Sequence, residues 1–363
     1  MKRLLLVLLA LAPMAGTTTA APKGKYLIAF SQATMNHPWR VTMNNDMELY
    51  AKKYGVDFVW LDGNDDPATQ LNGVKNLLTK KPDLLFASPC KAEPMSPIVQ
   101  WAKDAKVPLI TIDRGLPMEP DGKGYLSFVI ADLAWQQYDM ANILIDKITK
   151  KNGKASGSIL ELMGSIGSSA ANDQHRGLQE SLKKYPDVKV VASQAGDYDR
   201  NTSLRVVENW LKMYPKGSVD GILCANDESA LGAIQAVKEA GRTELLGFIT
   251  GVNGQREALK AMLDGEMLAT NMNGPYWGET SFKAAMDYLQ KGIKPAKYIM
   301  VLMPSYRADN ANELKRVKEA YDYCVLNNVQ YPPISVWVES GKRLSLPVTN
   351  DIPAVFKQHY GLL

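Results

Sequence analysis

Five polar segments of the chain bring together amide, carboxylate, guanidinium and aromatic side chains. Carboxylates and amides accept hydrogen bonds from hydroxyl groups, arginine donates through a planar fork, and an aromatic face covers the apolar side of a ring. A neutral polyhydroxylated ligand needs this chemistry. A local salt bridge or a core Trp explains any single segment equally well, so the interpretation depends on all of them lying together. The segments are residues 31–40 (SQATMNHPWR), 113–114 (DR), 167–172 (GSSAAN), 196–200 (GDYDR) and 226–228 (NDE).

The usual signatures of catalysis and metal binding are missing from the sequence. It contains neither G-x-S-x-G nor a Walker loop, so nucleophile-elbow hydrolysis and P-loop NTP hydrolysis lack their usual sites. His37, His175 and His359 are isolated, which argues against a zinc cluster. The acidic run 62–67 (DGNDDP) has Pro67 where a calcium loop needs glycine, which favours a turn at a helix entry. We therefore expect no catalysis, no cofactor and no metal.

The elements that must position these segments are short apolar runs alternating with helical stretches. This alternation predicts parallel sheets covered on both faces, in which ligands bind at the carboxyl ends of the strands. The polar segments follow such runs, so we expect them to line one crevice. Strands are predicted at 26–30, 57–61, 84–87, 107–112, 158–163, 188–192, 221–225, 245–250, 267–272 and 298–302. Helices are predicted at 38–54, 67–78, 98–105, 171–185, after Asp199, and at 229–240, 255–263, 276–291 and 310–323.

The first twenty residues have the order of a secretory signal peptide. Lys2 and Arg3 precede an apolar run that ends in small residues, with cleavage expected after Ala20. A retained anchor is the alternative, although the run is shorter than the ~20 residues that span a bilayer. The mature chain keeps 40 basic residues (42 less Lys2 and Arg3) against 38 acidic ones, which argues against nucleic-acid binding. We expect a soluble protein in the periplasm.

Three widely spaced cysteines, Cys90, Cys224 and Cys324, leave two arrangements open. An exported chain permits one disulfide with one thiol left over. The favoured alternative is that all three pack as buried thiols.

Several of these segments carry a resemblance to the ribose-type periplasmic binding proteins of carbohydrate ABC importers. The resemblance covers residues 25–302. It implies two Rossmann-like lobes with parallel sheets, joined by three hinge crossings, that close on a sugar held between them. The matching segments are IAFSQATMNHPW (28–39), VPLITIDR (107–114), GSIGSSAAN (164–172), GDYDR (196–200) and CANDESALGA (224–233).

In the first lobe, the resemblance implies five ligand-binding residues. Asn36 or His37 is expected to form a hydrogen bond from the first loop. Trp39 falls where the family places an aromatic that stacks on the ring. Asp113 and Arg114 match the Asp-Arg pair of the family.

In the second lobe, Tyr198 matches a stacking aromatic and Asn226 matches an amide. The remaining positions depart from the ribose pattern, so we expect a ligand other than ribose. Gain of an arginine and loss of a carboxylate make the predicted pocket more positive, which leaves a sugar acid possible; for the arginine, a solvated position on the first helix is the alternative. The departures are Arg40 in place of an aromatic, Asn172 in place of an arginine, Asn253 in place of an aspartate and Asn273 in place of a glutamine.

The resemblance also divides the chain into segments. A signal peptide occupies residues 1–20. The N-terminal lobe takes 22–130 plus 274–302, and the C-terminal lobe takes 131–273. Residues 303–363 form an extension about which the resemblance says nothing, and a run with strand character lies within it at 336–346.

The expected function is capture of a small sugar or polyol by a monomer that docks on ABC importer permease subunits. A chemoreceptor is a further candidate partner. One alternative is a sensory module that signals to a membrane kinase, because the same lobes would serve. Another is a secreted carbohydrate-active enzyme, which needs two carboxylates about 5–10 Å apart, whereas the predicted crevice has one, Asp113. A sugar-responsive repressor shares these lobes, but this chain has a leader where such a protein has its helix-turn-helix.

Overall fold

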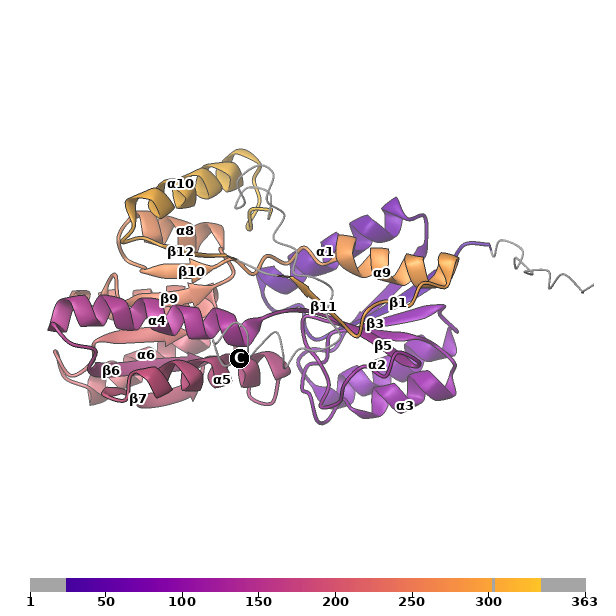
Figure 1. Cartoon of the computed structure of the whole chain (residues 1–363), viewed down its shortest axis with the longest axis horizontal. Coiled ribbons are helices and arrows are strands. Elements are labelled where there is room, and N and C mark those ends of the chain that lie inside the picture. The colour runs from indigo at the N-terminus through magenta and orange to yellow at the C-terminus, as the bar shows by residue number, and fades with distance from the viewer. Residues whose placement is uncertain (1–23, 302–303, 334–363) are drawn as a thin grey trace, which may run out of the picture.

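The computed structural model describes residues 24–301 and 304–333, which form two α/β lobes side by side (Figure 1). Each lobe contains one six-stranded sheet with helices packed against it. The chain passes from one lobe to the other at residues 131–133, 271–278 and 301–305. The predicted fold of two Rossmann-like lobes joined by three hinge crossings is confirmed.

The first lobe is built on a parallel sheet with the strand order β11-β5-β4-β3-β1-β2. One buried cluster joins this sheet to α1 and α9, and a second joins it to α2 and α3. The strands are β1 (Leu27–Gln32), β2 (Asp57–Asp62), β3 (Leu84–Ala87), β4 (Leu109–Ile112), β5 (Tyr125–Ala131) and β11 (Tyr298–Val301). The helices are α1 (Pro38–Lys53), α2 (Pro67–Thr79), α3 (Pro97–Asp104) and α9 (Gly278–Lys291).

The second lobe has the strand order β12-β10-β9-β8-β6-β7, and β12 is the antiparallel member. Helices α4 and α5 pack on one face, while α6, α7, α8 and α10 share the cluster on the other. The strands are β6 (Gly157–Met163), β7 (Val188–Ala195), β8 (Gly221–Cys224), β9 (Ile249–Val252), β10 (Ala269–Asn271) and β12 (Ser305–Arg307). The helices are α4 (Leu133–Asn152), α5 (Ser169–Lys184), α6 (Arg200–Met213), α7 (Asp227–Glu239), the 3-10 turn η1 (Thr243–Leu245), α8 (Arg256–Leu263) and α10 (Ala311–Leu326).

Side-chain caps fix where the helices begin beside the crevice. The carboxylate of Asp66 accepts a hydrogen bond from the Thr69 N–H at the start of α2, which satisfies a donor that the helix leaves free. The acidic run 62–67 is therefore a helix entry, as predicted. Ser168, Asp199 and Asn226 cap α5, α6 and α7 in the same way, so three polar segments of the second lobe are held by the helices that they start.

Three elements, β5, α4 and the short strand β12, were missing from the sequence-based prediction. Strand β5 is buried along its whole length, and α4 follows it as a 20-residue helix. Asp132 caps α4 and Gly153 ends it in a left-handed conformation. The strand predicted at 245–250 lies instead at Ile249–Val252, because η1 ends at Leu245 and a turn follows it.

The three cysteines are buried as free thiols, which matches the favoured alternative. Within the described ranges, no helix combines the length and hydropathy needed to cross a membrane. The predicted signal peptide and the strand-like run at 336–346 lie outside the described residues. The described part of the extension, β12 and α10, packs on the second lobe.

Candidate ligand-binding site

A cavity lies between the two lobes, at the carboxyl ends of their parallel strands. Nine of the eleven predicted site residues line it. They are His37, Trp39, Arg40, Asp113, Arg114, Tyr198, Asn226, Asn253 and Asn273. Four more lining residues were not predicted: Leu133, Ala170, Gln174 and Ala225.

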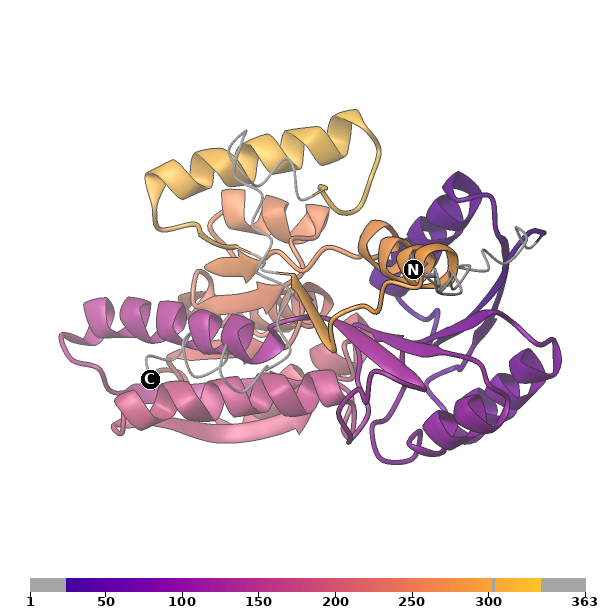
Figure 2. The same cartoon turned by 45° about the vertical axis from the view of Figure 1, so that its right-hand side comes forward.

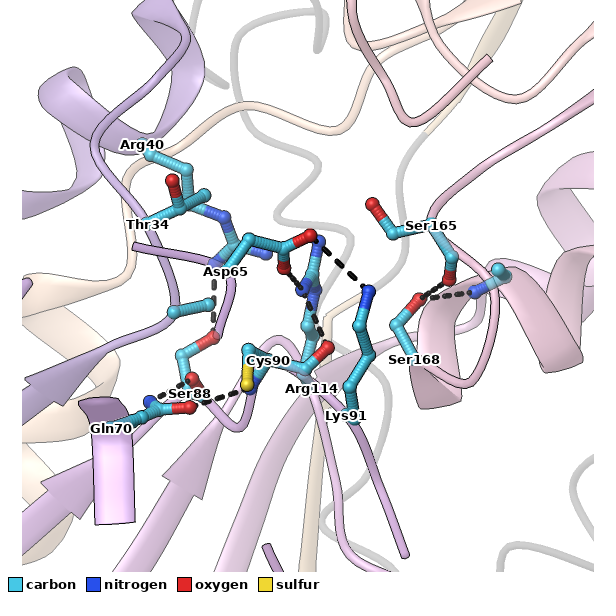
Figure 3. A network of polar contacts seen from close by, with 12 residues as sticks. Thr34, Arg40, Asp65, Gln70, Ser88, Cys90, Lys91, Arg114, Ser165 and Ser168 are labelled. Carbon is cyan, nitrogen blue, oxygen red and sulfur yellow. Dashed lines mark hydrogen bonds and ion pairs between the residues drawn. The ribbon is translucent and has the colours of Figure 1, made fainter. Parts of the chain in front are cut away.

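The buried charges of the cavity begin with an ion pair between Arg40 and Asp113. An Arg40 Nη lies 2.6 Å from Asp113 Oδ2, and both residues are under 5% exposed. The other Nη of Arg40 donates to Ser88 Oγ at 2.9 Å (Figure 3). Burial lowers the pKa of Arg40 to about 10, so the guanidinium stays charged at neutral pH. The alternative of a solvated Arg40 is wrong, and its charge is balanced by Asp113.

Arg114 is the second buried cation, and Asp113 is not its ion-pair partner. One Nη donates to the Cys90 carbonyl at 3.0 Å and lies 3.5 Å from the Asp65 carboxylate, which also pairs with Lys91 (Figure 3). Its guanidinium carbon is 5.6 Å from the centre of the Tyr198 ring, which belongs to the other lobe. A local salt bridge between the two adjacent residues therefore does not explain the Asp-Arg segment.

Trp39 is both a wall of the cavity and a core residue. It is 4% exposed and its ring centre lies 6.5 Å from that of Trp277. Its indole Nε1 donates to the Asn273 carbonyl at 2.6 Å, in the crossing between β10 and α9. Trp39 is therefore both a cavity-lining residue and part of the hydrophobic core.

The second lobe presents a chain of hydrogen bonds that fixes its aromatic ring. Tyr198 Oη donates to Gln174 Oε1 at 3.0 Å, and Gln174 Nε2 donates to the Ala225 carbonyl at 2.7 Å. Asn226 Nδ2 donates to the Tyr198 carbonyl at 3.1 Å, while Asn226 Oδ1 caps α7. The Asn226 amide is therefore already engaged within the protein.

Four buried polar atoms of lining residues have no hydrogen-bond partner within the described structure: His37 Nδ1, Arg40 Nε, Arg114 Nε and Asn273 Oδ1. Leaving such a group unsatisfied costs about 1–3 kcal/mol. Burial and the two arginines hold the pKa of His37 well below its usual value, so its ring is neutral. These unpartnered atoms include both donors and acceptors, and a ligand hydroxyl group can pair with either kind.

Three lining residues have a backbone conformation that L-residues rarely adopt. The φ angles are 64° at Asp113, 58° at Tyr198 and 129° at Asn253. Each residue lies just beyond the end of a strand, where the chain turns away from the sheet.

The lobes are closed on one another. Ala92 N donates to the Gly167 carbonyl at 2.8 Å, and Gly115 N donates to Ser169 Oγ at the same distance. Each of these bonds joins a loop of the first lobe to the segment that starts α5 in the second.

Two predicted site residues, Asn36 and Asn172, do not line the cavity and are exposed. The N–H of Asn36 donates to Thr34 Oγ1 in a turn before α1, which leaves the side chain outward. Asn172 lies on α5 two residues from Gln174, and two residues turn a helix by about 200°. Gln174 therefore faces the cavity where Asn172 cannot, and counting two residues further along the helix finds it.

We expect Gln174→Ala to weaken ligand binding by about 5- to 30-fold, because the Tyr198 hydroxyl and the Ala225 carbonyl both lose a buried partner. Asn172→Ala on the same helix is the matched control, and its affinity is expected to stay within twofold. Titration calorimetry on both variants checks this. Equal losses in the two would contradict the placement of Gln174.

Comparison with known proteins agrees with this geometry. Residues 28–294 match the family model described as a periplasmic binding protein domain. The chain belongs to the periplasmic binding protein family. The galactofuranose-binding protein YtfQ of Escherichia coli (strain K12) is 31% identical over 329 residues, which cover 89% of this chain and 99% of that protein. The ribose import binding protein RbsB of Salmonella typhimurium is 31% identical over 82% of this chain and 96% of its own length.

A solved structure is similar over nearly the whole of its length. It is the periplasmic binding component of the arabinose ABC transporter from Shewanella sp. ANA-3, bound to α- and β-L-arabinofuranose. It shares 27% identity with this periplasmic binding protein and a TM-score of 0.74, over 87% of this chain and 99% of that one. The predicted resemblance to the ribose-type proteins is thereby confirmed.

The cavity of this periplasmic binding protein is lined by polar, charged and aromatic side chains together with Leu133, Ala170 and Ala225. Asp113 is the one carboxylate among its lining residues, and Arg40 neutralises it. Among the described residues, no group of three or more His, Cys, Asp and Glu side chains is arranged to hold a metal ion.

Proposed function

We propose that this protein captures a neutral sugar or sugar-like polyol between its lobes in the periplasm and delivers it, chemically unchanged, to the permease subunits of an ABC importer. The observation that carries the proposal is the closed interlobe cavity, where unpartnered donors and acceptors of the first lobe and of the 271–278 crossing face residues of the second lobe. Ligand held there stabilises the closed form by its differential affinity for it.

A neutral ligand fits the charges better than a sugar acid. Each arginine of the cavity has a carboxylate beside it, Asp113 for Arg40 and Asp65 for Arg114. The more positive pocket expected from the sequence is therefore compensated. A ligand carboxylate would compete with Asp113 for Arg40 and would itself be desolvated.

The relatives narrow the sugars to be tested. YtfQ is named for galactofuranose and RbsB for ribose, and the Shewanella structure holds arabinofuranose. We propose pentoses and hexoses that populate a five-membered ring as the first candidates. A hexose in this form keeps hydroxyls on a side chain, and these could reach the unpartnered His37 and Asn273 atoms.

The test is a thermal-unfolding screen of the exported protein, refolded from denaturant to remove any bound ligand. The panel pairs each sugar with its polyol and its acid. We expect one or a few neutral members to raise the midpoint, because a ligand that binds the native state stabilises it by mass action. Recovered ligand should have an unchanged mass and NMR spectrum. No shift with any member, or an altered product, would contradict the proposal.

A partner other than a permease uses the same closed form. A chemoreceptor or a membrane kinase would recognise the same lobes, and nothing in the cavity separates these outputs. The genes beside the coding gene distinguish these functions: genes for importer subunits indicate transport, and a gene for a membrane kinase indicates sensing. Loss of sugar uptake in cells lacking the protein supports the importer.

A further inference from the structure

The chain that follows α10 turns back toward the hinge. Helix α10 ends at Leu326, and Asn328 takes a left-handed conformation with a φ of 51°. Val329 N then donates to the Cys324 carbonyl at 3.0 Å, which closes the turn. Figure 2 shows this segment bending back beside the α8 region of the second lobe.

Two consecutive carbonyls of this segment bind different parts of the molecule. The Gln330 carbonyl accepts from the N–H of Arg256 at 2.8 Å, which satisfies a free donor at the first residue of α8. The Tyr331 carbonyl accepts from the Tyr276 hydroxyl at 2.6 Å. Tyr276 belongs to the crossing at 271–278, so the segment links the second lobe to a hinge strand.

The Tyr331 ring is fully buried and packs in a cluster that contains side chains of both lobes, separate from the cluster that holds α10. The cluster of Tyr331 also contains Trp39 and Trp277. Helix α10 itself buries Val317 and Ala320 in the core of the second lobe. Residues a few positions apart in the sequence are therefore buried in two different clusters, one in the second lobe and one that includes side chains of both lobes.

The same crossing reaches the ligand cavity. Asn273 lines the cavity, and its carbonyl holds the indole of Trp39. Tyr276 and Trp277 follow within four residues, the first bonded to Tyr331 and the second packed in the same cluster. A short path of contacts thus runs from the segment after α10 to two cavity walls.

We propose that residues 327–331 form a strap across the hinge, and that Tyr331 is a positioning residue that sets Asn273 and Trp39 for ligand through the 271–278 crossing. The inference deepens the proposed function and rests on it. Sugar affinity would then depend on a C-terminal segment that does not itself line the cavity.

The experiment uses the full chain and the sugar identified in the thermal screen. Tyr331→Ala removes the buried ring, and Tyr276→Phe removes only the hydroxyl that donates to the strap. We expect calorimetry to show binding at least 10-fold weaker for the first and about 2- to 10-fold weaker for the second. Tyr331→Phe keeps the ring and the carbonyl and should bind within twofold of wild type. Leu326→Ala, at an 85% exposed position beside the strap, is the matched control.

A readout without sugar tests the strap independently. Trp277 is 1% exposed, so displacing the strap in Tyr331→Ala should shift the indole emission to longer wavelength, and a Trp277→Phe background should abolish that shift. A wild-type protein that binds no sugar overturns the proposed function, while the emission still decides the strap. Wild-type affinity in both Tyr331→Ala and Tyr276→Phe, or unchanged emission, overturns the strap. Should Tyr331→Ala fail to fold, Tyr276→Phe decides it.

Discussion

Asp113→Ala is expected to weaken sugar binding by roughly 10- to 150-fold and to destabilise the fold as well. The carboxylate is buried and paired with Arg40 at 2.6 Å. Losing a charged partner for a bound hydroxyl costs about 1.5–3 kcal/mol. Removing one member of a buried ion pair also lowers the free energy of unfolding by about 3–5 kcal/mol, because here the Arg40 charge would remain buried without a partner.

Calorimetry measures the affinity of this variant, and chemical denaturation measures its free energy of unfolding. Asp57→Ala removes an acid from the exposed pair with Lys25 and is the control, with little change expected in either quantity. Asp113→Asn keeps the shape and should lie between. Affinity within twofold of wild type, alongside a large loss of stability, would mean that the Arg40 pair is only structural.

Trp39→Ala is the second substitution with a large expected effect, and it should reduce both stability and affinity. A buried Trp replaced by Ala costs about 3–5 kcal/mol of folding stability. The variant also loses the bond to the Asn273 carbonyl and a wall of the cavity. A purely wet cleft wall would have lost affinity with little change in stability.

Trp39→Phe separates the two contributions. It keeps an aromatic face beside the ligand but removes the indole donor, so we expect partial affinity and a smaller loss of stability. Sugar titration should perturb tryptophan emission in wild type and less so in this variant. Trp39→Ala with unchanged affinity would exclude Trp39 as a ligand wall.

The sequence predicted most of the residues that line the interlobe cavity, because strand ends can be inferred from apolar runs and the cavity lies at those ends. Asp113 follows such a run directly, while Tyr198 and Trp39 lie three and seven residues beyond the ends of β7 and β1. The prediction that Asn172 faces the ligand was two residues off along α5, and a shift of two residues moves a side chain to the opposite side of a helix. The pairing of Arg40 with Asp113 could not be read, because 73 positions separate the two residues and only the sheet brings them together.

The missed elements lie at the connections between the repeating units. Strand β5 and helix α4 flank the first crossing between the lobes, and β12 follows the third. The placement of α10 depended on tertiary packing against α8, which local pattern does not specify. Local periodicity therefore predicted the repeating units, while the connections between them needed the structure.

Asp113, Tyr198 and Asn253 line the ligand cavity and also have strained backbone angles. A residue held in such a conformation costs of order 1–3 kcal/mol, and the surrounding fold must supply that energy. Glycine adopts the Asn253 angle without strain, so Asn253→Gly is expected to relieve the strain while removing a side chain that lines the cavity. At this position, selection for ligand capture therefore opposes selection for stability.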